Sequence, residues 1–446
     1  LATAADPVQV DPRVFGLDVR PGPIKKPLSP RLVTRDGGAT VVARVHAAVG
    51  KKWIALLPDG RLVVRDASNA TPTGRPFEPA EKNALAEKLK RNLDSTLNFE
   101  VRQTRRYLYV YNTSREFALA TSRILETMFP GIKGYARVQK IPTEPPAVPM
   151  VVIMFQNEKQ FQQRRKMPPG VVAYYDPISN HVVLYEQANA SRIKPQLGIQ
   201  QSISTIAHEG VHQILHNIGV QQRLSVWPMW LSEGLAEYLA PTSVGKRLRW
   251  KGPGNVNDLR MFELEQYLKG RKAESPDGEL IEDTILASRL TSTGYASAWS
   301  LTHFLARKRK QKFHALVRDV SRLGPFETLG AARSPGVVQE NLTLFRKHFG
   351  QDMAGLEKSL VQHLMSLPYN DPFAEYPHVV ALLQYHDGRR VRRQANVFHT
   401  RKLADRWTGE AIQKLTAKQR STVRKRHRVL PNRRAAERLA LSWLGK

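Results

Sequence analysis

Residues 206–219 read IAHEGVHQILHNIG and carry the strongest structural signal in the chain. Apolar residues recur here and just upstream at intervals of three and four, which is the period of a helix with one buried face. Pro195 suits a first helical turn, and Gly219 suits a C-terminal cap. The pattern predicts a helix over residues 196–218. Its apolar positions are Ile199, Ile203, Ile206, Gly210 and Ile214, with Val211, Leu215 and Ile218 widening the stripe.

Within this helix, residues 208–212 form a His-Glu-x-x-His pattern. Residues four apart lie one turn above each other, so His208 and His212 can direct two imidazole nitrogens at one point. A metal ion is expected there, and zinc is favoured because it binds neutral imidazole readily. Glu209 leaves the helix on an adjacent side, close enough to reach a water on the metal without binding the metal itself.

A third ligand must come from elsewhere, because a catalytic zinc usually has three protein ligands and one open position. The continuation that supplies a glycine and a third histidine is absent, since those positions hold Leu215 and Ile218. A second helix is predicted over residues 229–240. Glu233 and Glu237 lie four apart on it. One can bind the metal while the other accepts the second ring N–H of a ligand histidine.

The two helices resemble those of the gluzincin branch of the zinc metallopeptidases, in which a glutamate on the second helix is the third ligand. More narrowly, residues 230–238 (WLSEGLAEY) and 295–299 (YASAW) are similar to bacterial peptidase-MA-like proteins of unknown function. The chain between residues 99 and 305 also resembles that family. Ser232 stands where many members have asparagine, a departure that concerns a substrate contact more than the metal.

The resemblance implies a role for each residue of the two helices. His208, His212 and Glu233 would be the metal ligands. Glu209 would be the general base, and Glu237 would accept a hydrogen bond from a ligand histidine. The implied fold is a zincin-like metallopeptidase domain with two lobes.

Three further polar residues are weighed as site candidates. Tyr295 follows Gly294 near the start of a predicted helix over residues 295–307, and its phenol could donate to the oxyanion that forms when water attacks a carbonyl. A plain core position is the alternative for Tyr295, and His303 is the next candidate for the same role. We interpret His216 as a partly exposed residue near the helix end rather than a ligand.

Composition limits the class of protein. The chain has 446 residues, enough for two or three domains. It has no cysteine, which removes disulfides, thiolate zinc sites and cysteine nucleophiles. No apolar run reaches membrane-spanning length, so the protein is not expected to be transmembrane. Residues 1–5, LATAA, are consistent with the tail of a cleaved export signal, and we expect a periplasmic, cell-envelope or secreted protein.

The formal net charge is +30, which favours contact with polyanions such as nucleic acid, anionic lipid or acidic envelope polymers. About half of this excess lies in residues 388–446. Aromatic residues are sparse there, so contact with phosphate or carboxylate is better supported than stacking on bases. A solvated helical tail is the alternative interpretation.

Hydrophobic periodicity predicts an α+β protein in four parts. An extended arm is expected over residues 1–40 and a small antiparallel β module over residues 41–80. Strands and helices alternate in the first half of the metallopeptidase domain, residues 81–370, which suits a mixed sheet. A helical lobe is expected over residues 246–370. Residues 371–446 form a basic C-terminal extension.

Two strand predictions bear on the site. Residues 99–111 are predicted as one strand, and residues 171–175 and 181–185 as a hairpin. By resemblance, this hairpin would form the upper edge of the cleft, where a peptide can add as one more strand. An ordinary sheet edge, with tyrosines covering the core, is an equally open interpretation.

Together these features predict a zinc-dependent peptidase with Glu209 as general base. Its partner would be a peptide or protein substrate, and no pattern indicates an oligomeric state. A catalytically inactive zincin-fold protein, attached to an acidic surface through its basic tail, is the rival. Glu209 favours the enzyme, because a scaffold has no need for a carboxylate beside the water. A nucleic-acid-binding protein with an incidental metal is the third interpretation, and it predicts steeply salt-dependent DNA retention.

Overall fold

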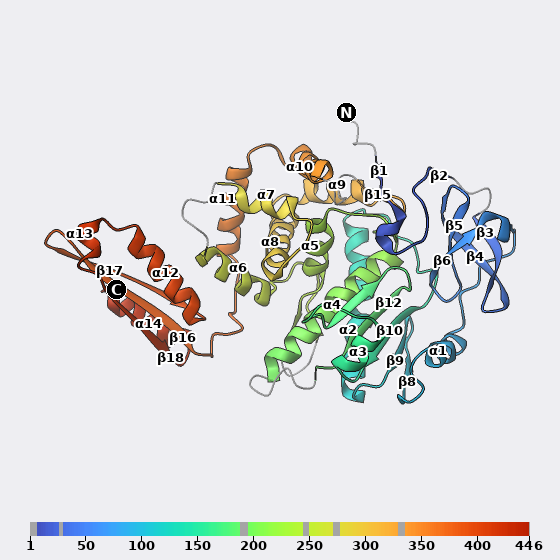
Figure 1. The fold of residues 1–446 in the computed structure, drawn as a ribbon, viewed down its shortest axis with the longest axis horizontal. Helices are drawn as coiled ribbons and strands as arrows, with labels where there is room; N and C mark the ends of the chain where they lie inside the picture. The colour runs from blue at the N-terminus through green and yellow to red at the C-terminus, as the bar shows by residue number, and fades with distance from the viewer. Residues whose placement is uncertain are drawn as a thin grey trace.

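The protein is elongated, with a β module at one end, an α+β body in the middle and a C-terminal unit at the other end (Figure 1). The export signal expected at residues 1–5 lies outside the described residues. Among the helices in the described part of the chain, none has the length and apolar character needed to cross a membrane. The computed structural model describes residues 7–25, 30–187, 195–243, 249–270, 277–328 and 335–445.

A five-stranded mixed sheet lies in the body. Its strands are β8 (Glu100–Gln103), β9 (Tyr107–Tyr111), β10 (Met150–Phe155), β11 (Ala173–Asp176) and β12 (His181–Tyr185). Their spatial order is β11-β12-β10-β9-β8. Strand β10 runs parallel to β9 and β12, while the edge strands β8 and β11 run antiparallel to their neighbours. The α+β class, the mixed sheet and the β11–β12 hairpin are therefore as predicted.

The single strand predicted over residues 99–111 was wrong, because this stretch is the β8–β9 hairpin. Val101 lies opposite Val110 in the antiparallel pair. Thr104 closes the turn: its N–H donates to the carbonyl of Tyr107 (3.0 Å), and its hydroxyl accepts from the Tyr107 N–H (3.2 Å). The turn contains no glycine, proline or asparagine, so the usual signal for a chain reversal is missing.

Helices cover both faces of this sheet. On one face lie α2 (Arg115–Val138) and α4 (Pro195–Asn217), and on the other lie α1 (Lys82–Arg91) and α3 (Glu158–Arg164). Every residue of β10 is buried, as expected for a continuous apolar strand with both faces covered.

The apolar core continues from the sheet into a helical part. Its helices are α5 (Met229–Leu239), α6 (Asp258–Gly270), α7 (Glu279–Leu286), α8 (Ser292–Lys308), α9 (Lys310–Val320), α10 (Pro335–Phe349) and α11 (Met353–Met365). A helical region was predicted here. The structure confirms it and adds two short strand pairs that were not predicted. These are β13 (Thr242–Ser243) with β14 (Arg249–Trp250), and β1 (Val8–Gln9) with β15 (Glu327–Thr328).

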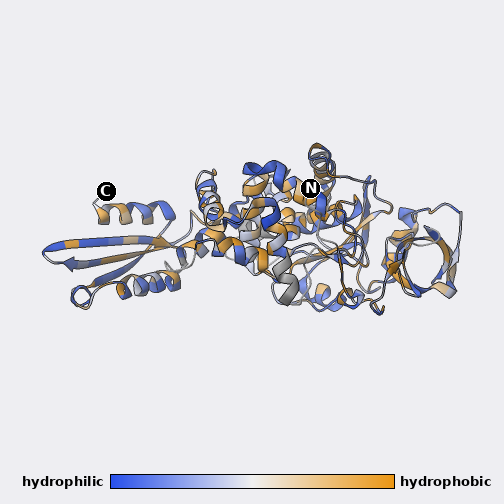
Figure 2. Ribbon diagram, turned by 90° about the horizontal axis from the view of Figure 1, so that it is seen from above, coloured by the Kyte–Doolittle hydropathy of each residue, from blue (hydrophilic) through white to orange (hydrophobic). Residues whose placement is uncertain are grey.

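The β module begins earlier than predicted. Its strands are β2 (Ile24–Lys25), β3 (Arg31–Asp36), β4 (Ala39–Val49), β5 (Lys52–Leu56), β6 (Leu62–Asp66) and β7 (Thr71–Pro72), with short 3-10 turns at Pro12–Phe15 and Ala67–Asn69. Strand β3 lies in the stretch expected to be an extended arm. It pairs along β4, with the buried Leu32 opposite Ala43, and the sheet curls strongly when seen from above (Figure 2). Charged residues at both ends of β3 hide its short alternating pattern.

The C-terminal region is a folded unit, so the interpretation as a solvated helical tail was wrong. Strands β16 (His378–Asp387), β17 (Arg390–Phe398) and β18 (Arg424–Leu430) form an antiparallel sheet with β16 in the centre. Helix α12 (Arg401–Gln413) covers one face and α14 (Arg433–Leu444) the other, with the short α13 (Ala417–Arg420) between them in sequence. The exposed side chains of the two edge strands are mostly arginine and lysine, which conceals their strand period.

Candidate metal centre

Two close helix contacts position the predicted ligands. A Cβ atom on Gly210 would lie 2.3 Å from Leu125 Cδ2 on α2, and one on Gly234 would lie 2.5 Å from the Ala298 carbonyl oxygen on α8. Neither position has room for a side chain. Helix α4 therefore packs closely against α2 in the body, and α5 packs closely against α8. The polar side chains of α4 and α5 face each other.

Three side chains from α4 and α5 converge. The Nε2 atom of His208 lies 3.1 Å from Nε2 of His212 and 3.0 Å from Oε2 of Glu233. The distance from His212 Nε2 to the same carboxylate oxygen is 3.3 Å. Among the described residues, these three are the one group of histidine and carboxylate side chains found with its ligand atoms within 4.8 Å of one another.

The donor set fits a divalent metal ion. Zinc–nitrogen bonds of roughly 2.0–2.1 Å put two ligands of a tetrahedral ion about 3.3 Å apart, close to the separations in this triad. Nδ1 of His208 lies 3.0 Å from Oε1 of Glu237, which favours the ring proton on Nδ1 and leaves Nε2 as a lone-pair donor. Two imidazoles and one carboxylate are a common ligand set for catalytic zinc.

Glu237 occupies a different position from Glu233. Its Oε1 is 2.6 Å from Arg260 Nη2, and its Oε2 accepts a hydrogen bond from Asn257 Nδ2 at 2.9 Å. Burial of this side chain, which is 2% exposed, raises the pKa, but Arg260 and His208 outweigh burial and hold the Glu237 pKa at about 2. The geometry thus separates the two glutamates: Glu233 faces both Nε2 atoms, whereas Glu237 is an ionised acceptor behind one histidine.

Glu209 lies beside the triad. Its Oε2 accepts a hydrogen bond from the backbone N–H of Tyr175 on the edge strand β11, at 2.8 Å. Burial raises the pKa of Glu209 above its usual value, and the charge of Glu233 acts in the same direction. The carboxylate is therefore oriented by the sheet as well as by its own helix.

A cavity of about 460 Å³ opens at this site. Its walls come from the segment around β11, from α4, and from the beginnings of α6 and α8. Side chains and backbone of these elements line it, including Val172, Ala173, His208, Glu209, Arg260 and Tyr295. A carbonyl group inside the cavity could therefore approach His208, Glu209 and Tyr295 together.

Residues 202–327 match a family described as a protein of unknown function, DUF1570. No curated protein matches the chain. The DUF1570 segment includes His208, Glu209, His212, Glu233 and Glu237. Its description carries no activity.

The DUF1570 segment also contains Tyr295, and the structure brings this residue to the cavity wall. The ring lies edge-on to His208, with centroids 5.8 Å apart, and the guanidinium of Arg260 lies 5.2 Å from the Tyr295 ring centroid. Burial raises the pKa of Tyr295, so the phenol keeps its proton at neutral pH. Thr291 caps the start of α8 by accepting from the N–H of Gly294, which sets the position of Tyr295.

The other two candidates lie away from the triad. His303 contacts His363 through Nδ1 (3.0 Å) and the carbonyl of Gly254 through Nε2 (3.2 Å). His216 contacts the carbonyl of Gln221 through Nδ1 (3.0 Å) and stacks on the ring of Tyr175. Both histidines therefore have contacts with the surrounding protein, and neither lines the cavity.

Sequence reasoning missed Arg260, Asn257 and Tyr175. A charged residue in the first turn of a helix, such as Arg260, is ordinarily a solvated surface position, and no spacing connects it to α5. Tyr175 acts through its backbone N–H, which carries no sequence signal. The one sequence signal that pointed to such partners was the pair Glu233 and Glu237. Two glutamates one turn apart on a buried helix need cationic or N–H partners, although the sequence does not say which residues supply them.

Proposed function

We propose that this protein is a zinc-dependent peptidase built on a zincin-like two-lobed domain. The sheet with α2 and α4 would form one lobe, and helices α5–α11 the other. The observation that carries the proposal is the convergence of His208, His212 and Glu233 at one point, with His208 and Glu209 on the wall of a cavity. A binding protein would gain nothing from a carboxylate held at this place.

Each residue of the site has a part in the proposed reaction. Zinc, held by His208, His212 and Glu233, would supply Lewis acidity that activates a water and polarises the scissile carbonyl. Glu209 would take the proton of the attacking water and pass it to the leaving amine. The hydrogen bond from the Tyr175 N–H keeps the Glu209 carboxylate oriented for both transfers.

Tyr295 is proposed as the donor to the developing oxyanion. Its phenol is protonated, and the ring is held between His208 and the guanidinium of Arg260. In hydrolases, removal of one such donor lowers kcat by a factor of about 10²–10³.

Among the described residues, no strand pairs with β11 on the side away from β12, which supports an extended peptide as substrate. Because the N–H of Tyr175 points away from β12 to Glu209, the backbone of Ala173, two residues earlier, points the same way. Ala173 also lines the cavity. A peptide that adds to this edge would run past the triad.

The decisive experiment compares the wild type with Glu209→Gln. Metal analysis of the two purified proteins is expected to give equal zinc content, because Glu209 is not a ligand. Cleavage of a peptide library is expected only from the wild type, since glutamine cannot accept the proton. Hydrolysis by the Gln variant would remove the general-base assignment. Absence of zinc from both proteins, even after incubation with it, would remove the proposal.

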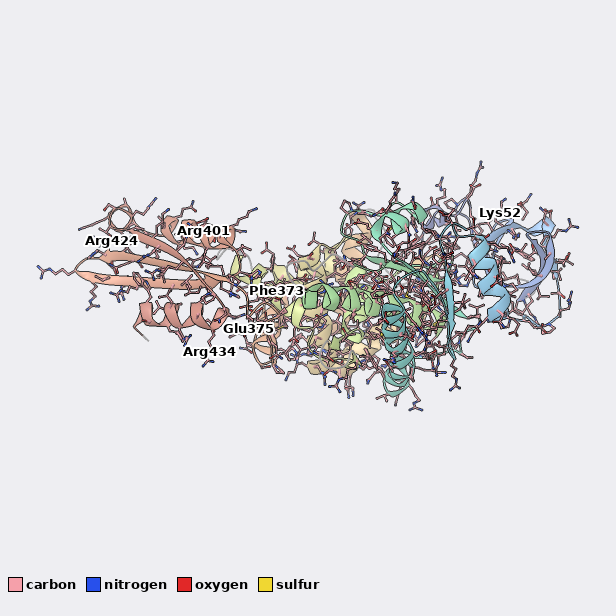
Figure 3. The ribbon with its side chains drawn as sticks, turned by 90° about the horizontal axis from the view of Figure 1, so that it is seen from below. Lys52, Phe373, Glu375, Arg401, Arg424 and Arg434 are labelled. Atoms are coloured by element: carbon pink, nitrogen blue, oxygen red, sulfur yellow. The ribbon has the colours of Figure 1, made fainter. Side chains whose placement is uncertain are left out.

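A second candidate function concerns the C-terminal unit, which we propose contacts polyanions. Its edge strand β18 exposes four cations that have no carboxylate partner among the described residues: Arg424, Lys425, Arg426 and Arg428. Basic side chains are also present on α12 and α14, and those of Arg401, Arg424 and Arg434 are marked in Figure 3. Phosphate or carboxylate groups are the partners that such unpaired cations favour.

A further inference from the structure

A second cavity, of about 880 Å³, lies apart from the metal centre. It shares no lining residue with the cavity at the triad. Segments from the start of α1, the β8–β9 turn, the second half of α2 and the loop before β10 form its walls. None of its lining residues is acidic, and six are basic: Lys82, Arg105, Arg106, Lys133, Arg137 and Lys140.

Four of the six cations have neither an ion pair nor a side-chain hydrogen bond among the described residues. Arg106 pairs with Glu126 at 2.8 Å, and Lys82 donates to the carbonyls of Thr104 and Arg105. The side chains of the remaining four have no such partner: Arg105, Lys133, Arg137 and Lys140. Like charges that converge on one concave surface repel each other and focus a positive potential into it. An anion would relieve this repulsion.

The dipole of helix α2 explains the positions of only two of these four cations. Arg137 and Lys140 lie at the C-terminal end of α2, where cations are favourable without any ligand. Lys133 and Arg105 lie outside that last turn, so the dipole does not explain them. Lys140 also adopts a φ of 55°, a conformation that glycine takes most easily at a helix end. A lysine at this position puts a cation on the cavity wall in spite of backbone strain.

The rest of the wall is mostly apolar, and it is stiff. Ile141, Val148 and five prolines line the cavity: Pro79, Pro130, Pro142, Pro146 and Pro149. Proline fixes φ, so the segment around residues 142–149 has few alternative conformations. Lys82 ties down the β8–β9 turn on the other side. A cavity formed before the ligand arrives costs less ordering on binding.

We propose that this basic cavity is a binding site for a phosphorylated organic molecule of nucleotide size. Its phosphate groups would contact Arg105, Lys133 and the cations at the end of α2, since Arg and Lys pair strongly with phosphate. Its apolar ring system would pack on the prolines. The volume lies within the range of roughly 300–1,000 Å³ typical of small-molecule sites. This site is independent of the proposed peptidase function.

The test is titration calorimetry of the full chain with adenosine triphosphate at physiological salt. We expect a dissociation constant below 1 mM and at least tenfold weaker binding in the double variant Arg105→Gln/Lys133→Gln. A matched control, Arg123→Gln/Lys159→Gln, removes two exposed cations that do not line the cavity, and its affinity should stay within twofold. Both double variants keep the metal centre unchanged, so any nucleotide bound there affects them equally.

Two further probes separate the parts of the ligand. Adenosine alone should not bind measurably, and inorganic triphosphate should bind more weakly than adenosine triphosphate because it lacks the ring system. Equal weakening in both double variants would show that the affinity comes from overall charge, and would overturn the proposal. It would also be overturned by failure of the wild type to bind below 1 mM, or by triphosphate binding as tightly as the nucleotide. Peptide hydrolysis is not a readout, so failure here leaves the peptidase proposal standing.

Discussion

Charges that are not ligands hold the triad in position. Glu237 is almost completely buried, and it is satisfied by Arg260, Asn257 and His208 together. Arg260 makes a second ion pair, with Glu263 at 2.7 Å, so the guanidinium cannot turn away from the site. The orientation of His208 therefore depends on a chain of partners that ends on α6.

Removing the guanidinium tests this dependence. Arg260→Met leaves Glu237 without its cation, and we expect zinc affinity to fall about 10–100-fold, as is usual when a partner behind a ligand histidine is lost. Competition with a coloured chelator measures the change. Arg346→Met, which breaks the distant ion pair with Glu282, should leave zinc affinity unaltered. Unchanged affinity in a folded Arg260→Met protein would mean that Glu237 holds His208 without help.

Among the elements, the edge strand β11 connects the sheet to the site. One side of it pairs with β12, and the opposite side bears the N–H that Glu209 accepts. The strand can therefore position the Glu209 carboxylate, the proposed general base, and still offer backbone groups at Ala173 to the proposed peptide substrate. An edge strand that only covered the core would leave this side to solvent.

Proline at position 173 tests the strand-addition model. Ala173→Pro removes the N–H that points toward the cavity but leaves the pairing with β12 intact, because that N–H does not take part in it. We expect KM for a cleaved peptide to rise about five- to tenfold, which is the worth of one hydrogen bond, while zinc content stays the same. Ala173→Ser keeps the N–H and should behave as the wild type. An unchanged KM in the proline variant would exclude substrate pairing at this position.

In the whole molecule, about half of the excess positive charge lies in the C-terminal unit, within residues 388–446. The C-terminal unit lies at the far end of the protein from the β module (Figure 1). It is anchored to the helical part, because Arg433 pairs with both Glu265 (2.8 Å) and Asp371 (2.7 Å). A polyanion bound there would therefore be held at a defined place relative to the cavity.

Neutralising β18 tests the polyanion contact. The variant Arg424→Gln/Lys425→Gln/Arg426→Gln/Arg428→Gln should elute from immobilised DNA at lower salt than the wild type, because it makes fewer phosphate contacts. Each lost contact also makes the slope of log K against log salt concentration less steep by about 0.9. A control that replaces four exposed cations elsewhere, Arg20, Lys51, Arg91 and Arg123, should shift elution much less. Equal shifts would attribute retention to net charge instead of to this unit.

Local patterns in the sequence were sufficient where the chemistry is local. The period around residues 206–219 predicted α4, and a spacing of four placed His208 and His212 on one face of it. The same reasoning found the second helix and its two glutamates, and it found the buried strand β10, because continuous or periodic apolar runs report burial directly.

Tertiary structure decided what depends on partners distant in the chain. Which glutamate faces the imidazole nitrogens was open from spacing alone, and it follows from the way α5 packs against α8 at Gly234. The contacts from Arg260 and the Tyr175 N–H join separate segments, so no local pattern could contain them. The C-terminal sheet escaped prediction because the exposed residues of its edge strands are mostly arginine and lysine, and the strands become recognisable only from their pairing with β16 and from the packing of α12 and α14 on the two faces of the sheet.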